Sequence, residues 1–272
     1  MDVLANDSES GRDSNKATAR ILKVFSSFAS DAAKFGVTEL SHQLGMTKNM
    51  VHRALQTLAD QGYLMRDASG SRYQLSYRVL ELQNHGVMEP DFRTLCQPYV
   101  QAIYRLTGET VSVLVRSLDY AVFIDGVETR KTGVWRMPIG GLRPLHSTAS
   151  GRAMLAYSSD DDIDDYIRRH RPMRFHNSEE TISGPELWQE IKAIRGRGYA
   201  IMRRGGNLPM YSLAFPIMAA EGRVHGVISV GGPEERFKPE VPALLPRLLE
   251  IVEELRGRAR LYATNQAGTE IN

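Results

Sequence analysis

One stretch decides the fold of the N-terminal part of this chain: VTELSHQLGMTKNMVHRALQTLADQGYLMRDASGSRYQLS, residues 37–76. It contains two short helical patterns joined by a turn at Gly45-Met46, then two β-rich segments on either side of residues 67–71. This order is typical of a helix-turn-helix with a β-wing. We expect Thr38 to cap the first helix, Gly45 to end it with a positive φ, and Thr47 to cap the second. The stretch therefore predicts a DNA-binding head.

The second helix of this pattern starts at about Lys48 and has one apolar and one polar face. The apolar face is formed by Val51, Ala54, Leu55 and Leu58. A helix in the major groove needs amide, hydroxyl and guanidinium groups near its N-terminus. The residues predicted to read DNA are Thr47, Lys48, Asn49, His52, Arg53 and Gln56. A face that is only solvated is the alternative; the wing argues against it, because Arg66 and Arg72 flank its turn and are predicted to reach phosphates.

Composition and length are those of an ordinary globular protein. The chain has 272 residues, 42% of them hydrophobic and 24% charged, which allows two domains. No apolar run approaches the roughly 20 residues of a membrane span, so no membrane association is expected. Residues 1–15 lack the basic start and apolar centre of a signal peptide, and the single Cys96 has no partner for an intramolecular disulfide. We therefore expect a cytoplasmic protein.

Positive charge is concentrated in the predicted head. Residues 16–78 hold nine Lys and Arg against four Asp and Glu, a net charge of +5, whereas the whole chain carries only +2. A local excess of this kind is what binding to phosphates requires. The partner predicted for the head is therefore double-stranded DNA.

The chain divides into an ordered series of segments. Residues 1–15 are polar and without periodicity, which predicts a disordered tail. Apolar positions in residues 17–29 recur at helical spacing, so a third helix is expected to complete a winged head over residues 16–76. The next segments are predicted as a linker helix over residues 77–90, a second domain over residues 91–262 and a tail over residues 263–272. On the linker, Val79, Leu80, Leu82 and Val87 form an apolar stripe at which two chains are predicted to pair.

The second domain has the pattern of an α+β fold with one antiparallel sheet. Strands are predicted at residues 111–115, 121–125, 134–138, 199–203, 212–218 and 224–231. Helices are predicted at residues 90–107, 148–157, 160–169, 185–197 and 242–261. The alternating segments lie between helical ones, so we expect helices to pack on the sheet.

Seven motifs, taken together and in this order, resemble one known family. They are the head motifs GMTKNMVHRALQTLADQGYL and RYQLS, then TGETVSVLVR, PLHSTASGRAMLA, RGRGYAI, AFPI and GVISVGGP. Over about residues 17–261 the chain is similar to the isocitrate-lyase-regulator (IclR) family of transcriptional regulators. The resemblance implies an N-terminal winged helix-turn-helix and a C-terminal GAF-like domain that binds a small organic acid. It also implies a homodimer or homotetramer that binds a palindromic operator.

The resemblance carries an effector site onto particular residues. It places Ala149 and Ser150 where backbone N–H groups at a helix start meet an anionic ligand, which the helix dipole favours. Trp135 matches an apolar wall position, and Ser229 matches a polar strand position that faces the ligand. The chain departs from the family pattern at three positions, where Met202 stands for an Asp, Ser212 for a Cys and Gly231 for a Ser.

These departures favour a larger effector, because they remove polar partners suited to a two- or three-carbon keto acid. Arg143, just before the PLH motif, is predicted to hold a ligand carboxylate; the alternative is that it points to solvent. Flat and adaptable apolar walls are offered by Trp135, Met137, Met202 and Met210. We therefore expect a regulator of a catabolic operon that senses an aromatic carboxylate such as a hydroxybenzoate or phthalate. A short keto acid such as glyoxylate or pyruvate is the alternative.

A serine hydrolase is the competing hypothesis, because Ser150 precedes a helix and His146 lies four residues away. The segment TASGRA lacks the first Gly of the G-x-S-x-G elbow, and a structural hydrogen-bonding role is the favoured interpretation of His146. The single Cys has no partner for a zinc site, and no phosphate-loop Lys-Ser/Thr follows Gly231-Gly232. No catalytic residue, metal or cofactor is therefore expected.

Overall fold

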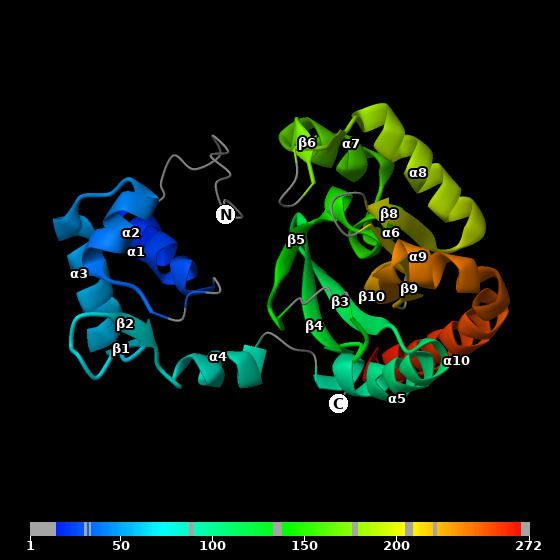
Figure 1. Cartoon of the computed structure of the whole chain (residues 1–272), viewed down its shortest axis with the longest axis horizontal. Helices are drawn as coiled ribbons and strands as arrows, with labels where there is room; N and C mark the ends of the chain where they lie inside the picture. Colours follow the sequence, from blue (N-terminus) through cyan, green and yellow to red (C-terminus); the bar gives the residue numbers. More distant parts are fainter. Residues whose placement is uncertain are drawn as a thin grey trace. The chain divides into compact units, whose positions relative to one another are not determined.

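The computed structural model describes residues 15–29, 32, 34–86, 90–132, 138–175, 179–204, 209–219 and 222–267. The chain forms two compact units, residues 1–88 and 89–272 (Figure 1). The division falls within the segment predicted as a linker.

The first unit is a small helical head with a β-wing. Its elements are α1 (Lys16–Ser26), a 3-10 turn (Ser27–Ala29), α2 (Val37–Leu44), α3 (Lys48–Asp60), β1 (Leu64–Arg66), β2 (Tyr73–Leu75) and α4 (Val79–Gly86). Helices α1, α2 and α3 share one core, in which Val24, Leu40, Val51 and Leu55 are fully buried. The apolar face predicted for α3 therefore packs as expected.

Helix caps fix the turn between α2 and α3. Gly45 ends α2 with φ +63°, and the Oγ1 of Thr47 accepts from the Met50 N–H at 3.3 Å, as predicted. The predicted cap at Thr38 is wrong, because α2 already begins at Val37 after Gly36. The Glu39 carboxylate instead accepts from the Gly36 N–H at 3.4 Å and so satisfies one of the unpaired donors at the helix start.

The second unit is built on an antiparallel sheet of six strands in the order β5-β4-β3-β10-β9-β8. The strands are β3 (Thr110–Ser117), β4 (Tyr120–Val127), β5 (Leu142–Pro144), β8 (Ala200–Arg204), β9 (Met210–Met218) and β10 (Val224–Pro233). Alternating residues on β3 point to opposite faces, so Val111 and Val113 pack on one side while Ser112 and Leu114 face the other.

Helices cover both faces of this sheet (Figure 1). One face packs on α5 (Pro90–Thr107) and α10 (Val241–Ala267), with Phe92, Cys96 and Ile103 in the shared core. Burial raises the pKa of the Cys96 thiol to about 12. The other face packs on α6 (Ala149–Leu155), and α7 (Asp160–Arg169) and α8 (Gly184–Arg197) belong to the same core. The remaining elements are a 3-10 turn (Leu145–Ser147), the hairpin of β6 (Met173–Arg174) and β7 (Thr181–Ile182), and α9 (Glu234–Phe237) followed by a 3-10 turn (Lys238–Glu240).

The predicted α+β class and most predicted elements are confirmed, and α5 and α7 have the predicted bounds. The third predicted strand, residues 134–138, lies almost wholly outside the described residues. The strand that pairs with β4 on that side is β5, which was not predicted because three residues are too short to show alternation. Among the described residues, no helix combines the length and the apolar character that a membrane span needs.

Candidate functional site

The polar face of α3 is open to solvent. Thr47, Lys48, Asn49, His52 and Arg53 are all exposed. Among the described residues, the side chains of the last four make no hydrogen bond or ion pair. Exposed polar side chains near the N-terminus of a helix are the arrangement that reads base edges in the major groove.

Gln56 and Arg66 both make hydrogen bonds within the head, and their predicted contacts with DNA stay predictions. Gln56 donates to Asp60 Oδ1 at 2.7 Å and accepts from Arg66 at 3.4 Å. The Arg66 guanidinium also donates to the Tyr73 hydroxyl at 2.9 Å and to the Gly70 carbonyl at 3.2 Å. Arg66 therefore ties the wing to α3, and we call the contacts among Gln56, Arg66 and Tyr73 the wing tie.

Arg72 directly precedes β2, the second strand of the wing. Its guanidinium pairs with the Glu39 carboxylate at 3.0 Å, and both side chains are about half exposed. An ion pair this exposed contributes little stability, so Arg72 keeps access to solvent beside α2. That Arg66 and Arg72 touch phosphates stays a prediction.

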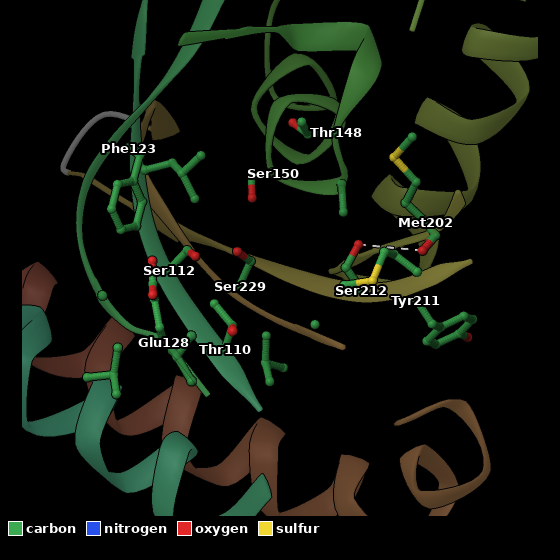
Figure 2. A pocket seen from close by; sticks show the side chains of 18 of the residues that line it. Thr110, Ser112, Phe123, Glu128, Thr148, Ser150, Met202, Tyr211, Ser212 and Ser229 are labelled. Carbon is green, nitrogen blue, oxygen red and sulfur yellow. Dashed lines mark hydrogen bonds between the residues drawn. The ribbon is translucent and has the colours of Figure 1, made fainter. Parts of the chain in front are cut away.

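A cavity of about 280 Å³ lies in the second unit, and the register of the sheet explains its floor. Residues opposite each other on antiparallel strands direct their side chains to the same face. One row of such partners is Thr110, Gly231, Ser212 and Met202. The next row is Gly126, Ser112, Ser229 and Ala214. Most of these residues are small or carry a hydroxyl, so the sheet leaves open space above them (Figure 2).

The walls of the cavity come from elements that are distant in sequence. Ser147, Thr148, Ala149 and Ser150 line it from the turn and helix after β5. Apolar contacts are added by Leu114, Phe123, Val127, Pro138, Ile139, Met210 and Tyr211, and Glu128 follows the end of β4. The volume is close to the roughly 300–1,000 Å³ typical of small-molecule sites.

Most of the predicted effector residues are brought together here. Ala149, Ser150, Met202, Met210, Ser212, Ser229 and Gly231 all line the cavity. Trp135 and Met137 lie outside the described residues. The prediction did not include Thr110, Ser112, Phe123 and Glu128; pairing 110–112 with 229–231 across β3 and β10 would have found the first two.

Arg143 corrects one prediction. It lies on β5 opposite Ala121, and its Nη1 donates to the Leu142 carbonyl at 2.8 Å. It is not among the residues that line the cavity. Pairing of β5 with β4 holds Arg143 at the edge of the sheet, so the structure does not bring it to the cavity.

The start of α6 is held by close backbone packing. The Thr148 hydroxyl accepts from the Gly151 N–H at 2.9 Å and caps the helix. A Cβ on Gly151 would lie 2.2 Å from the Leu145 carbonyl oxygen, so only glycine fits there. This contact fixes the 3-10 turn against α6, and with it the cavity wall from Ser147 to Ser150.

His146 braces the same turn from behind. Its Nε2 lies 2.8 Å from the Arg174 carbonyl oxygen and its Nδ1 lies 2.8 Å from the Tyr166 hydroxyl. Since a carbonyl only accepts, Nε2 carries the hydrogen and Nδ1 accepts from Tyr166. Burial lowers the pKa of His146 to about 4. Both ring nitrogens thus have partners other than Ser150, which removes the base that a hydrolase would need and supports the structural interpretation of His146.

A buried carboxylate anchors β3 beside the cavity. Glu109 accepts from Arg236 at 2.7 and 2.8 Å and from Lys131 at 3.0 Å. Burial alone would raise the pKa of Glu109, but the hydrogen bonds from these two cations outweigh it and lower the pKa. The two ion pairs of this cluster are structural. Within the described part of the chain, no group of His, Cys, Asp and Glu side chains could hold a metal ion.

Comparisons with protein families cover both units. The model of the bacterial transcriptional regulator IclR C-terminal domain matches residues 85–256, and the model of the IclR helix-turn-helix domain matches residues 17–68.

Curated relatives are similar over most of the chain. The HTH-type transcriptional regulator KipR of Bacillus subtilis is 31% identical over 221 residues, which cover 80% of this chain and 85% of KipR. The HTH-type transcriptional regulator KdgR of Escherichia coli is 27% identical over 247 residues, covering 90% of this chain and 91% of KdgR. These relatives are named as regulators and not as enzymes.

Solved structures share the fold. An IclR homolog from Microbacterium hydrocarbonoxydans, crystallised in complex with 4-hydroxybenzoate, superposes with a TM-score of 0.72 at 20% identity, covering 89% of this chain and 99% of that one. An IclR-family regulator from Brucella abortus gives a TM-score of 0.71 at 26% identity, covering 94% and 97%. With a family model that spans most of the chain and relatives that match both units, this protein belongs to the IclR family of transcriptional regulators, with an N-terminal helix-turn-helix and a C-terminal effector-binding domain.

Proposed function

We propose that this regulator binds a palindromic operator through two heads and releases or remodels it when a ring-bearing organic acid enters the cavity of the second unit. In this proposal it acts in the cytoplasm on a catabolic operon. The observation that carries the choice of ligand is the cavity floor, where strand register places Gly231, Ser212 and Met202 in one row. The family resemblance implies Ser, Cys and Asp at these three positions.

The lining supports a ring over a short acid. Met202 is 94% buried at one end of the floor, and Phe123 and Leu114 add flat and branched apolar surface. A two- or three-carbon acid would leave this surface without contacts, whereas a benzene ring fills it. A related protein of the same fold has been crystallised with 4-hydroxybenzoate, which agrees with a cavity of this kind in the fold. We assign the ligand carboxylate to the wall at Ala149 and Ser150.

Calorimetry tests this choice. The whole protein is titrated with 4-hydroxybenzoate and benzoate on one side, and with glyoxylate and pyruvate on the other. We expect heat only with the ring acids. Tight binding of the short acids alone would make the keto-acid alternative correct. Met202→Asp introduces the polar residue that the family resemblance implies. It should lower the affinity for ring acids by about tenfold, since it places a charge beside the ring. Ser212→Cys, which introduces the implied thiol at the neighbouring position, is the milder control.

DNA binding is tested on the head and on the whole protein. Residues 16–78 alone should bind duplex DNA weakly, because one head neutralises few phosphates, whereas the whole protein should bind a palindrome with a steep dependence on salt. Equal affinity of the whole protein for every duplex at physiological salt would contradict operator recognition.

Pairing of two chains is proposed at residues 77–86. Tyr77, Leu80 and Leu82 are exposed there by 86%, 50% and 51%, which is a large apolar surface for a short helix. Dimer formation would bury it and give the two-fold symmetry that a palindrome needs. A monomeric mass at micromolar concentration, measured by light scattering, would contradict this pairing. Leu80→Glu with Leu82→Glu should lower the mass, and Leu118→Glu, at an exposed turn of the second unit, should not.

A further inference from the structure

Gly231 leaves an opening in the floor of the cavity. In the row of the sheet that runs from Thr110 to Met202, Gly231 pairs with Thr110 on one side and with Ser212 on the other. Side chains at such opposite positions start roughly 4.5–5.5 Å apart at their Cβ atoms. Because glycine has no side chain, the row is interrupted between two hydroxyl residues. A Cβ built on Gly231 would lie 3.0 Å from the Ser212 Cβ, so a side chain here would take up the opening.

Three hydroxyl groups surround this opening. Thr110 and Ser212 flank Gly231 on the neighbouring strands, and Ser229 precedes it by two residues on β10. Residues two apart on a strand face the same side and lie about 7 Å apart. All three side chains line the cavity, and Figure 2 shows them on the strands of its floor. We call Gly231 and these three hydroxyl residues the glycine notch.

The hydrogen bonds already made in the glycine notch decide which groups it still offers. Thr110 Oγ1 accepts from the Thr129 N–H at 3.1 Å, and among the described residues the hydrogen of this hydroxyl has no acceptor. The Ser212 hydroxyl donates to the Met202 carbonyl at 3.5 Å, which leaves its lone pairs available. Ser229 makes no hydrogen bond within the described part of the chain. The notch therefore offers a donor at Thr110 and an acceptor at Ser212.

We propose that the glycine notch holds a hydroxyl group on the ring of the effector, with Thr110 and Ser212 as specificity-determining residues. This inference rests on the proposed function, because it takes a ring acid as the ligand of the same cavity. The ligand's carboxylate meets the α6 wall at Ala149 and Ser150, and its ring hydroxyl enters the opening above Gly231. There it donates to Ser212 and accepts from Thr110.

This pairing distinguishes a hydroxyl group from other ring substituents. A hydroxyl has one hydrogen and two lone pairs, so it satisfies both partners at once. Benzoate makes neither contact. A methyl ether has no hydrogen to donate to Ser212, and it brings a methyl group into an opening that a single Cβ would fill. Two hydrogen bonds between neutral groups correspond to a preference of about tenfold for the hydroxy acid over benzoate.

The experiment is a calorimetric panel on the whole protein with benzoate, 3- and 4-hydroxybenzoate, and the methyl ether of each hydroxy acid. The better of the two hydroxy acids should bind about tenfold tighter than benzoate, and its methyl ether should bind no tighter than benzoate.

Variants then locate the preference in the glycine notch. Gly231→Ala fills the opening, so the better hydroxy acid should come within about twofold of benzoate. Ser212→Ala removes the acceptor without adding volume and should lower the preference to about threefold. Gly196→Ala is the matched control, because it makes the same substitution in α8, where a Cβ meets nothing within 4 Å. It should keep the wild-type preference.

The outcomes separate the two proposals. If no ring acid binds the wild-type protein, the proposed function fails and this inference fails with it. If ring acids bind but neither hydroxy acid exceeds benzoate, the glycine notch is overturned while the proposed function stands. The same holds if Gly231→Ala or Ser212→Ala keeps the full wild-type preference. The wild-type panel and Ser212→Ala keep the test decisive if Gly231→Ala does not fold.

Discussion

The reading face of α3 and the cavity of the second unit are both polar surfaces prepared for a ligand, but they are built in opposite ways. The reading face consists of neighbours on one helix, exposed to solvent, and the side chains from Lys48 to Arg53 that it presents have no partner among the described residues. The cavity is assembled from β3, β4, β8, β9, β10 and the start of α6. A group on the reading face therefore contributes to binding alone, whereas a group at the cavity wall also contributes to the fold.

This contrast predicts different responses to substitution. Changes at the wall should lower stability first and binding as a consequence. Changes on the reading face should alter DNA affinity and leave stability within about 0.5 kcal/mol, as is usual for exposed positions.

The largest expected effect is that of Gly151→Ala. The new methyl group would lie 2.2 Å from the Leu145 carbonyl oxygen and 2.5 Å from the Leu145 Cα, both of them backbone atoms that cannot rotate away. We expect a loss of about 3 kcal/mol or more in the free energy of unfolding of the second unit, with loss of ring-acid binding because the wall moves. Urea unfolding and calorimetry measure the two quantities.

Gly196→Ala is the matched control. Gly196 lies in α8, and a Cβ there would meet nothing within 4 Å. Alanine should stabilise that helix by about 0.5–1 kcal/mol. Similar stabilities for the two variants would mean that the packing of α6 on the turn does not support the wall.

The next effect is the pH dependence that comes from His146. Its pKa is about 4 in the folded protein and about 6.5 when unfolded. Below pH 6.5 the unfolded chain therefore binds a proton that the folded chain does not, so stability falls as pH falls and stops falling near pH 4. Between pH 6.5 and 5 the loss should be about 1.5 kcal/mol, measured by urea unfolding.

His146→Gln should flatten this dependence while lowering stability at pH 7, since Gln keeps a donor for the Arg174 carbonyl but cannot titrate. Carboxyl groups with a lowered pKa, such as Glu109, change stability only below about pH 4.5 and do not affect the range between pH 6.5 and 5. A slope that persists in the variant would assign the proton uptake to another group.

The smallest effects are expected on the head. Asn49→Ala or Arg53→Ala should weaken operator binding by about 1–2 kcal/mol with little change on a scrambled duplex, if each reads a base. Arg66→Ala breaks the wing tie. It should weaken binding to both duplexes by a similar factor of less than about tenfold, because it loosens the wing instead of removing a base contact. Competition binding on the two duplexes separates these cases, and equal losses for Asn49→Ala would make it a backbone contact.

The same contrast explains what the sequence could predict. The reading face depends on local spacing, so the start of α3 at Lys48, its cap at Thr47 and its exposed face follow from residues 37–76. Several cavity residues were predicted through family resemblance. Thr110 and Ser112 were missed because their place depends on the pairing of β3 with β10, which links residues more than 100 positions apart. Arg143 was misplaced because the short β5 that holds it has no clear periodic pattern.

Cys96 gives this protein a practical property. It is the only cysteine of the chain, it is fully buried, and its thiol stays protonated far above neutral pH. Thiol reagents attack the thiolate, so the native protein presents almost no background for chemical labelling. A single cysteine introduced on the head would then carry the only spin label or fluorophore of each chain. In the proposed dimer, the distance between two such labels would report directly how far the heads move when an acid fills the cavity.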